Sequence, residues 1–239
     1  MIFLNKKPFD IILLEETHVQ TSDIKQWQTE WKGFSTWNPG RTGKTCGSGV
    51  LINKQKQITV LDYKKDEQGR VITIKAEYQK QRFQVSNLYA PDRPHLRETF
   101  FQLLISYLFD DCPLIMGGDF NMVEDETLDR YGGTHSHTHT QGIVNLQKIL
   151  NAFDLQDKWR FHNKHKREFT WKSRRINENI KSRLDRFYIA ESIKYADSET
   201  LYTVWSDHSV LILKIKMGTP NTRGTNFWKL NTTVLQELL

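Results

Sequence analysis

The chain has 239 residues, enough for one large α/β domain or two small ones, and 38% of them are hydrophobic, so a core forms without metals or disulfides. A formal net charge of +6, from 34 basic and 28 acidic side chains, mildly favours an anionic partner such as nucleic acid. A membrane partner is not expected, because no apolar run approaches the roughly 20 residues that span a bilayer. The two cysteines, Cys46 and Cys112, are far apart and predict free thiols in a reducing compartment, the nucleus or the cytosol.

The first part of the chain predicts four strands. Residues 10–16 are an apolar run that ends in acidic side chains, and residues 47–52 form a second predicted strand. Apolar and polar side chains alternate over residues 71–78 and again over residues 83–89. Residues 79–81 predict a tight turn between them, so these two strands form a predicted β-hairpin.

The second part of the chain combines helices with further strands. The predicted elements are a helix over residues 100–108, a buried strand at 114–116, a helix over 143–153 and strands at 169–172, 183–189 and 209–215. Because hairpin strands and crossover helices are mixed, the predicted fold class is α/β with mixed rather than purely parallel sheets. Residues 218–224 are rich in Gly, Pro, Thr and Asn, which divides the chain into a domain at 1–217 and a linker at 218–239.

Five polar clusters end or follow an apolar strand. They are Glu16-Thr17-His18, Asn87-Leu88-Tyr89-Ala90-Pro91, Gly117-Gly118-Asp119-Phe120-Asn121, Ser182-Arg183-Leu184-Asp185-Arg186 and Ser206-Asp207-His208-Ser209. Any one of them has an ordinary explanation, because Asp or Asn after Gly-Gly is usually a turn residue and Ser-Asp-His before a strand is usually a polar loop. Together they supply the carboxylates, amide, phenol and imidazole that metal-assisted phosphodiester hydrolysis needs.

In this order, the five clusters resemble the endonuclease/exonuclease/phosphatase superfamily, which includes exonuclease III and the major abasic-site endonucleases. The resemblance runs from about Pro8 to Ile215. Together with Leu128-Asp129-Arg130, the first, second and fourth clusters resemble more specifically the endonuclease domain of LINE-type non-LTR retrotransposons. The tail Phe227-Trp228-Lys229-Leu230-Asn231 is similar to the segment that leads toward reverse transcriptase in such elements. The resemblance implies a four-layered α/β sandwich, in which two stacked mixed β-sheets are flanked by helices.

The resemblance also implies a hard divalent cation, Mg²⁺ or alternatively Mn²⁺. Glu16 would ligate this cation through oxygen. Asp207 would lie beside it as a ligand or as a partner of a ligand, and Ser182 is a weaker candidate for the second of these roles.

The catalytic roles implied by the resemblance fall on five side chains. Asp119 would orient or deprotonate the attacking water. Asn121 and Tyr89 would donate hydrogen bonds to phosphate oxygens and to the developing charge. His208 would bind the phosphate, and Asp185 would pair with His208 and hold the orientation of its ring.

The activity implied by the resemblance is hydrolysis of one strand of duplex DNA. The nick would leave a 3′ hydroxyl, which primes reverse transcription in this family. The implied partners are therefore double-stranded DNA and, in the full-length element, a reverse transcriptase on the same polypeptide. The site of action would be the nucleus.

The sequence departs from the family at its beginning. Family members start with an earlier strand that carries a metal-ligating Asn, whereas this sequence starts in what should be the following helix, at Met1–Leu4. We therefore predict that the first strand is missing and that one sheet has an unpaired edge. One alternative is a DNA-binding remnant without turnover. Another is a phosphatase or sphingomyelinase relative of the same fold, which the basic charge balance and the lack of a membrane-associating segment disfavour.

Four further patterns have alternative interpretations. Residues 40–45 end like a P-loop, but a strand and not a helix is predicted after them, so a basic loop near DNA is favoured. His135, His137 and His139 have a spacing that suits a metal, but no acidic residue or cysteine is positioned nearby in the sequence to complete a site, which favours a solvated loop.

Basic side chains are dense over residues 160–167 and again at Arg174, Arg175 and Lys181. They form either a solvated surface or contacts with the DNA backbone, and a hairpin in this region probes the minor groove in the LINE family. Trp27 and Trp31 are four residues apart, as on one helix face, which favours core packing over base stacking.

Overall fold

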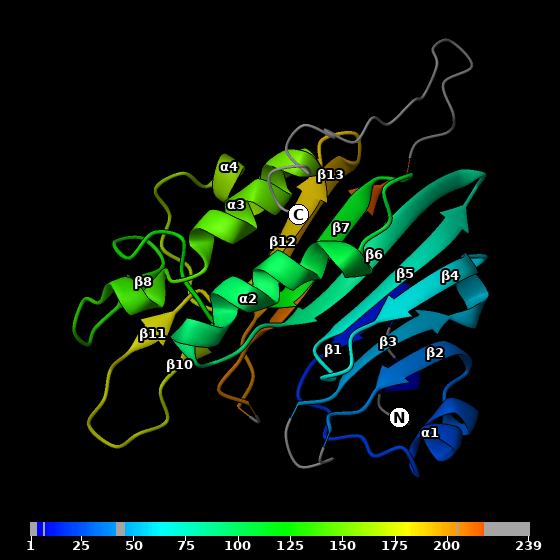
Figure 1. Cartoon of the computed structure of the whole chain (residues 1–239), viewed down its shortest axis with the longest axis horizontal. Helices are drawn as coiled ribbons and strands as arrows, with labels where there is room; N and C mark the ends of the chain where they lie inside the picture. The colour runs from blue at the N-terminus through cyan, green and yellow to red at the C-terminus, as the bar shows by residue number, and fades with distance from the viewer. Residues whose placement is uncertain (1–3, 7, 42–45, 205, 218–239) are drawn as a thin grey trace.

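The computed structural model describes residues 4–6, 8–41, 46–204 and 206–217 (Figure 1). Its strands are β1 (Ile11–Leu14), β2 (Gly33–Asn38), β3 (Ser48–Asn53), β4 (Thr59–Lys65), β5 (Val71–Tyr78), β6 (Gln81–Tyr89), β7 (Leu114–Asp119), β8 (Arg130–Tyr131), β9 (Leu155–Gln156), β10 (Trp171–Lys172), β11 (Lys181–Ser182), β12 (Asp185–Ala190), β13 (Lys194–Leu201) and β14 (Val210–Lys216). Its α-helices are α1 (Ile24–Glu30), α2 (Pro94–Leu104), α3 (Ile143–Ala152) and α4 (Lys158–His162), and its 3-10 turns are η1 (Leu4–Lys6), η2 (Lys54–Lys56), η3 (Ile105–Tyr107) and η4 (His137–His139). The predicted mixed α/β class is confirmed.

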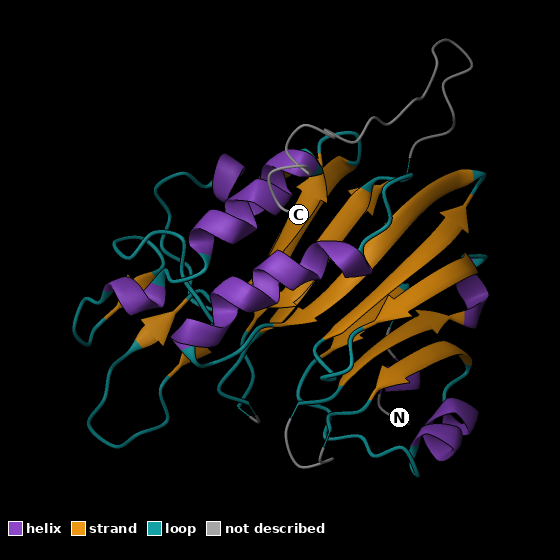
Figure 2. Ribbon diagram, viewed as in Figure 1, coloured by secondary structure: helices purple, strands orange, loops and turns teal. Residues whose placement is uncertain are grey.

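The largest sheet has the strand order β4-β5-β6-β7-β12-β9. Its only parallel pair in the described ranges is β6 with β7, because the chain returns through α2 between them. Helices α2 and α3 lie across one face of this sheet (Figure 2). Phe101 and Leu104 of α2 and Ile149 of α3 are buried in the same core as Met116 of β7, so the apolar helix faces and the sheet exclude water together.

A smaller sheet, with the order β1-β3-β2, packs on the other face of the large sheet. The side-chain amide of Asn87 on β6 donates to Leu14 O at 2.9 Å and to Gly49 O at 3.1 Å, which joins the two sheets. Gln84 is three positions earlier on β6 and therefore points to the opposite face, where it donates to Phe109 O beyond α2. Because side chains alternate between the two faces of β6, Asn87 binds the three-stranded sheet on one face and Gln84 binds the helical layer on the other.

β1 and β2 are the two edge strands of the three-stranded sheet. Among the described residues β1 pairs with β3 alone, and β13 and β14 form a separate two-stranded sheet. The buried Asn87 Oδ1 also lacks a hydrogen-bond partner in the part of the chain that the structure describes. The missing first strand itself stays a prediction.

Six of the described strands were not predicted from the sequence: the longer β2, β4 and β13, and the two-residue strands β8, β9 and β11. The tryptophans before and within β2 pack as expected, since Trp31 is buried with its Nε1 donating to Ile52 O at 3.0 Å. Trp27 meets the Trp37 ring edge-on at 4.8 Å between centroids.

No helix in the described ranges is long and apolar enough to cross a bilayer. The predicted linker at 218–239 and most of the loop at 40–45 lie outside the described residues.

We expect Gly118→Ala to lower the free energy of unfolding by at least about 2 kcal/mol. Gly118 has a φ of +133°, and a Cβ there would lie 2.0 Å from Leu88 O on the neighbouring β6. Urea titration followed by circular dichroism measures the change. Leu103→Ala, on the exposed side of α2, is the control and should change stability by less than about 0.5 kcal/mol. Equal stability of the two variants would contradict the close approach of β6 and β7.

Candidate active site

Three neighbouring strands bring polar side chains to one edge of the large sheet. Strands β6 and β7 are parallel and end in Tyr89 and Asp119, which are paired in register. Strand β12 is antiparallel to β7 and begins with Asp185, which is paired with Asp119. The phenol and the two carboxylates therefore form a row across three strands, at the mouth of a cleft of about 400 Å³.

The structure brings the predicted site residues together. The cleft is lined by Glu16, Tyr89, Asp119, Asn121, Ser182, Asp207 and His208. Asp185 joins them because its carboxylate accepts a hydrogen bond from His208 Nδ1 at 2.9 Å. The predicted convergence on one cleft is observed, whereas the role of each residue stays a prediction.

His208 is held in place by backbone pairing with β10. Lys172 N donates to Asp207 O at 3.1 Å, and Ser209 N donates to Thr170 O at 2.7 Å. The hydroxyl of Thr170 accepts from Leu184 N and Asp185 N, both at 3.0 Å. Thr170 therefore orders the segments that carry both members of the Asp185–His208 pair, and the sequence pattern gave no signal for it.

Asp119, Asp185 and His208 form the most compact group of potential metal ligands among the described residues. One ligand atom from each lies within 4.8 Å of the other two. Burial and the charge of Asp185 raise the pKa of Asp119 to about 7. Burial alone would lower the pKa of His208, but its hydrogen bond to Asp185 and the charges of the surrounding carboxylates raise it to about 9.

Glu15 interacts electrostatically with Asp119, Asp185 and His208, although Glu16 and not Glu15 was predicted as a site residue. Burial and the charges of Asp185 and Asp119 raise the pKa of Glu15 to about 8. Glu16, at a φ of +50°, is exposed and accepts a hydrogen bond from the Tyr89 hydroxyl. Burial and the neighbouring Glu16 carboxylate raise the pKa of the Tyr89 phenol above its usual value. Of the two successive side chains after β1, Glu15 therefore interacts with the carboxylates of Asp119 and Asp185, whereas Glu16 lies at the rim of the cleft.

This donor set fits a hard divalent cation. Oxygen donors are the ligands that Mg²⁺ prefers, and burial together with neighbouring carboxylates raises the pKa values of Glu15 and Asp119. The predicted ligand Asp207 is on the rim, where it accepts from Trp171 Nε1 at 3.1 Å and lies 3.8 Å from Arg174. A cation near Asp119 and Asp185 would lower the cost of keeping both carboxylates ionised.

Asn121 follows Asp119 in a left-handed backbone conformation with a φ of +49°. Its backbone N donates to Asp119 Oδ1 at 2.8 Å, which fixes the carboxylate. Its Nδ2 donates to Ala90 O at 2.8 Å, which orients the side-chain amide at the wall of the cleft.

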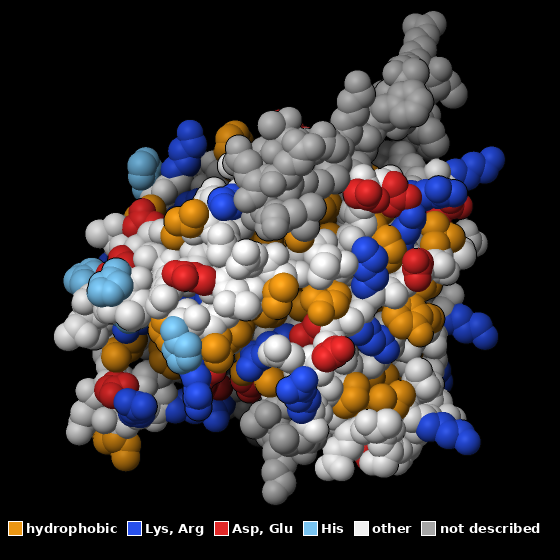
Figure 3. All heavy atoms as spheres, in the orientation of Figure 1, with side chains coloured by type: hydrophobic (Ala, Val, Ile, Leu, Met, Phe, Trp, Pro, Cys, Tyr) orange, Lys and Arg blue, Asp and Glu red, His pale blue; other side chains and the backbone are white. Residues whose placement is uncertain are grey.

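The dense basic residues have divided roles. Arg160 binds the buried Asp129 and two backbone carbonyls, so it is a structural cross-link. Arg174 and Arg175 are exposed on the loop between β10 and β11. On the face shown in Figure 3, Lys and Arg side chains are interspersed with acidic ones and form no large patch of one sign.

The interpretation of the three histidines was wrong in one respect. An acidic residue does lie beside them, because the Glu126 carboxylate binds His135 Nδ1 at 2.7 Å and also His139 Nδ1. His139 lines the cleft together with Arg97 and Arg130, which the sequence analysis did not select. Periodicity along the chain gave no signal for these contacts.

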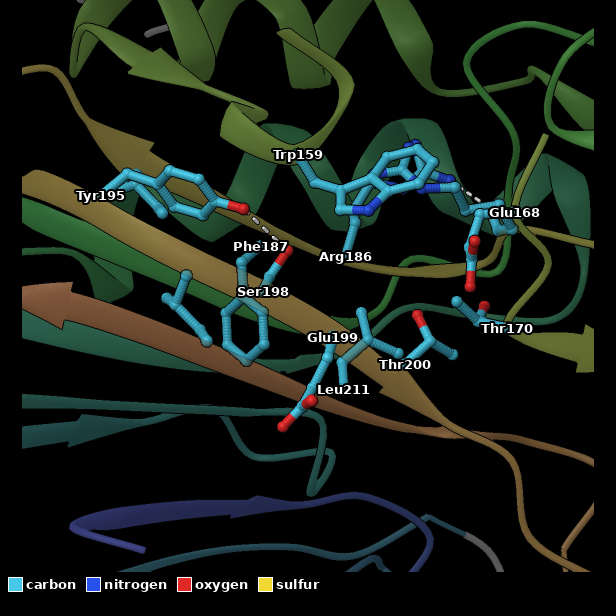
Figure 4. A pocket seen from close by; sticks show the side chains of 13 residues that line it. Trp159, Glu168, Thr170, Arg186, Phe187, Tyr195, Ser198, Glu199, Thr200 and Leu211 are labelled. Atoms are coloured by element: carbon cyan, nitrogen blue, oxygen red, sulfur yellow. Dashed lines mark hydrogen bonds between the residues drawn. The ribbon is translucent and has the colours of Figure 1, made fainter. Parts of the chain in front are cut away.

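A second cavity, of about 20 Å³, lies between β12 and the β13–β14 hairpin. Trp159, Tyr195 and Ser198 are among the side chains that line it (Figure 4). It has room for about one water molecule and is too small for a nucleotide. The cleft at Asp119 is therefore the candidate active site.

The chain belongs to the Endonuclease/Exonuclease/phosphatase family, whose family model matches residues 2–208. The sequence is 28% identical over 240 residues to the transposon TX1 uncharacterized 149 kDa protein of Xenopus laevis. The match covers 98% of this chain and 18% of that protein, so the chain spans less than a fifth of its transposon relative. The family predicted from the sequence and its likeness to a transposon-encoded protein are both confirmed.

Solved structures share the fold at low sequence identity. The catalytic domain of APE2 from Xenopus laevis matches with a TM-score of 0.71 and 18% identity, over 90% of this chain and 86% of that one. An AP endonuclease from Archaeoglobus fulgidus matches with a TM-score of 0.66 and 16% identity, over 90% and 92%. The 3′ phosphatase NExo from Neisseria, bound to a product DNA hairpin, matches with a TM-score of 0.62 and 17% identity, over 90% and 92%.

We expect Asp185→Asn to lower the pKa of His208 from about 9 toward the ordinary value of about 6.5, because the carboxylate that stabilises the imidazolium is removed. Nuclear magnetic resonance titration of the histidine rings, in metal-free protein, measures the shift, and the exposed His95 ring is the internal control. A raised folded-state pKa stabilises the fold below about pH 6.5, and this stabilisation is lost as the pH rises through 9. The wild type should therefore lose more stability over this interval than Asp185→Asn; an unchanged His208 titration would contradict the pairing.

Proposed function

We propose that this chain is a metal-dependent DNA endonuclease domain that nicks duplex DNA and leaves a 3′ hydroxyl, as target-primed retrotransposition requires. The observation that carries the proposal is the Asp119–Asp185–His208 group, set in one cleft with Glu16, Tyr89 and Asn121. The likeness to a transposon protein and to structures of DNA-processing enzymes supports the same conclusion.

The proposed chemistry assigns separate tasks to the side chains in the cleft. A bound Mg²⁺ or Mn²⁺ would polarise the scissile phosphate and neutralise the leaving 3′ oxygen. We propose Glu16 and Asp207 as residues that hold it, beside the oxygens of Asp119 and Asp185. With a pKa of about 7, Asp119 accepts a proton from water near neutral pH. With a pKa of about 9, His208 is cationic near neutral pH and donates from Nε2 to the phosphate, while Asp185 fixes its Nδ1.

The proposed substrate is double-stranded DNA. Strands β10 and β11 form a hairpin, and its loop carries Ile176, which is 90% exposed. The two residues before Ile176, Arg174 and Arg175, are also exposed. An apolar side chain at the tip of a basic hairpin suits insertion into a DNA groove. Trp171, at the base of this hairpin, lines the cleft and so connects the hairpin to the Asp207 segment.

The unpaired edge of β1 leads to a proposal about the complete domain. A further strand paired with β1 would extend the three-stranded sheet that is stacked on the large sheet, as in a four-layered sandwich. The protein would act in the nucleus, with a reverse transcriptase on the same polypeptide. The open edge also supports the second candidate function, a DNA-binding remnant that lacks turnover.

In a supercoiled-plasmid nicking assay with Mg²⁺, Asp119→Ala and His208→Ala should each lower the rate at least about 100-fold, because each removes a group that acts on the reacting phosphate or water. Asp197→Ala and His95→Ala remove exposed groups that do not line the cleft and are the matched controls. DNA binding without nicking by the wild type would identify the remnant instead. Nicking that survives both cleft substitutions would contradict the assigned roles.

Mg²⁺ should raise the melting temperature more at pH 8 than at pH 5.5, because pH 5.5 is below the carboxyl pKa values of about 7 for Asp119 and about 8 for Glu15, whereas pH 8 is above the first and equal to the second. Both groups have raised pKa values, so their ionisation destabilises the fold as the pH rises, and a cation offsets this cost. Thermal unfolding with and without Mg²⁺ measures the difference, and Asp119→Asn should reduce it. A larger effect of Mg²⁺ at the lower pH would show that the cation binds elsewhere.

A further inference from the structure

A second carboxylate-bound imidazole lines the cleft and has no part in the chemistry proposed above. His139 belongs to η4, and its Nδ1 is hydrogen-bonded to the Glu126 carboxylate. Burial alone would raise the pKa of Glu126, but hydrogen bonds from His135 and His139 hold it below its usual value, so the carboxylate is ionised. Because an ionised carboxylate only accepts, Nδ1 of His139 is the donor, and Nε2 is left for a ligand in the cleft.

The backbone around His139 is fixed on two sides. Val123 N donates to His139 O at 3.0 Å. Because Val123 is four residues after Asp119, this bond connects the backbone of His139 to the segment that follows β7. Arg97 Nη1 donates to Thr138 O at 3.0 Å, while its other nitrogens bind two carbonyls before α2. The orientation of His139 is therefore prepared in the absence of substrate, which reduces the entropic cost of using it as a contact.

The surroundings of His139 are suited to an anion. Arg130 lines the same cleft and donates from Nη1 to Ser182 Oγ at 3.1 Å. Its Nε is buried, and within the described ranges it has no hydrogen-bond partner. Arg130 therefore brings a cationic side chain to the wall of the cleft that His139 also lines. The cleft, at about 400 Å³, has room for more than the single phosphate at Asp119 and His208.

We propose that His139, held by Glu126, is a phosphate-binding residue that contacts the DNA backbone at a phosphate next to the scissile one. This inference rests on the proposed function and adds a contact beyond the catalytic group. With the Glu126 carboxylate on one side and a phosphate on the other, the ring binds as an imidazolium with an N–H directed to each anion. Its contribution is to affinity and positioning, and the proton transfers remain with Asp119 and His208.

A metal site at Glu126 is less well supported. Of the described residues, only Asp119, Asp185 and His208 offer three ligand atoms within 4.8 Å of one another. The side chain of His135 is 77% exposed and that of His139 is 24% exposed, so the two imidazoles on Glu126 face different surroundings. This difference also supplies a matched control, because His135 shares the carboxylate and the loop but does not line the cleft.

The test is the affinity of the 239-residue chain for a fluorescent duplex oligonucleotide, measured by anisotropy with a chelator present, over a series of salt concentrations. At a pH of about 6.5, where an imidazole is readily protonated, His139→Ala should weaken binding about tenfold and reduce the salt slope by about one. His135→Ala should bind as the wild type does. In the nicking assay, His139→Ala should raise KM with little change in kcat, as expected for a contact made equally before and during the reaction.

The possible outcomes distinguish a failure of the His139 contact from a failure of the proposed endonuclease function. If the wild type nicks DNA but His139→Ala and His135→Ala behave alike, the inference is overturned and the proposed function stands. If the wild type binds no duplex DNA, both are overturned. A loss of kcat in His139→Ala at unchanged KM would also overturn the inference, because it would place His139 in the chemical step. Unchanged thermal unfolding of both variants should accompany the supporting result and exclude a loss of folding as its cause.

Discussion

The strand register across β6, β7 and β12 is the constraint on which the rest of the site depends. It sets Tyr89, Asp119 and Asp185 side by side, and a slip of one residue in either pairing would turn the side chains of one strand to the other face of the sheet. Gly118 permits this register because the Leu88 backbone lies where a Cβ would be. The close approach of β6 to β7, which pairs Tyr89 with Asp119, therefore excludes a side chain immediately before Asp119.

The register places carboxylates next to one another, and their negative charge shifts the pKa values of the groups in the cleft. Glu15, Asp119 and Asp185 repel one another in a poorly hydrated place, which raises the pKa of the first to about 8 and of the second to about 7. His208 compensates part of this charge and is itself kept cationic by Asp185. A fold selected for stability alone would not gather these groups, so the arrangement is best explained by a cationic ligand together with an anionic substrate.

The sequence predicted the interior of the fold better than its margins. Residues 71–78, 83–89 and 114–116 were recognised as strands because their burial produces strong alternation or apolar runs, whereas β4 and β13 are largely exposed and carry mixed polar side chains. The main site residues were found because they end such strands. Glu15, Thr170 and the Glu126–His139 pair were missed, because their importance arises from contacts between distant segments, which no local period encodes.

The net charge of the chain is a poor guide to where DNA would lie. Much of the positive charge near residues 157–186 is used internally: Arg183 binds Asp157 and Asp129, Arg160 binds Asp129, and Arg186 lies 3.4 Å from Glu124. Among the described residues of this region, basic side chains that face a ligand include those on the β10–β11 hairpin and Arg130 at the cleft. Recognition would then depend on where a few phosphates meet the cleft and less on long-range attraction, because charges of both signs are interspersed on the surface in Figure 3.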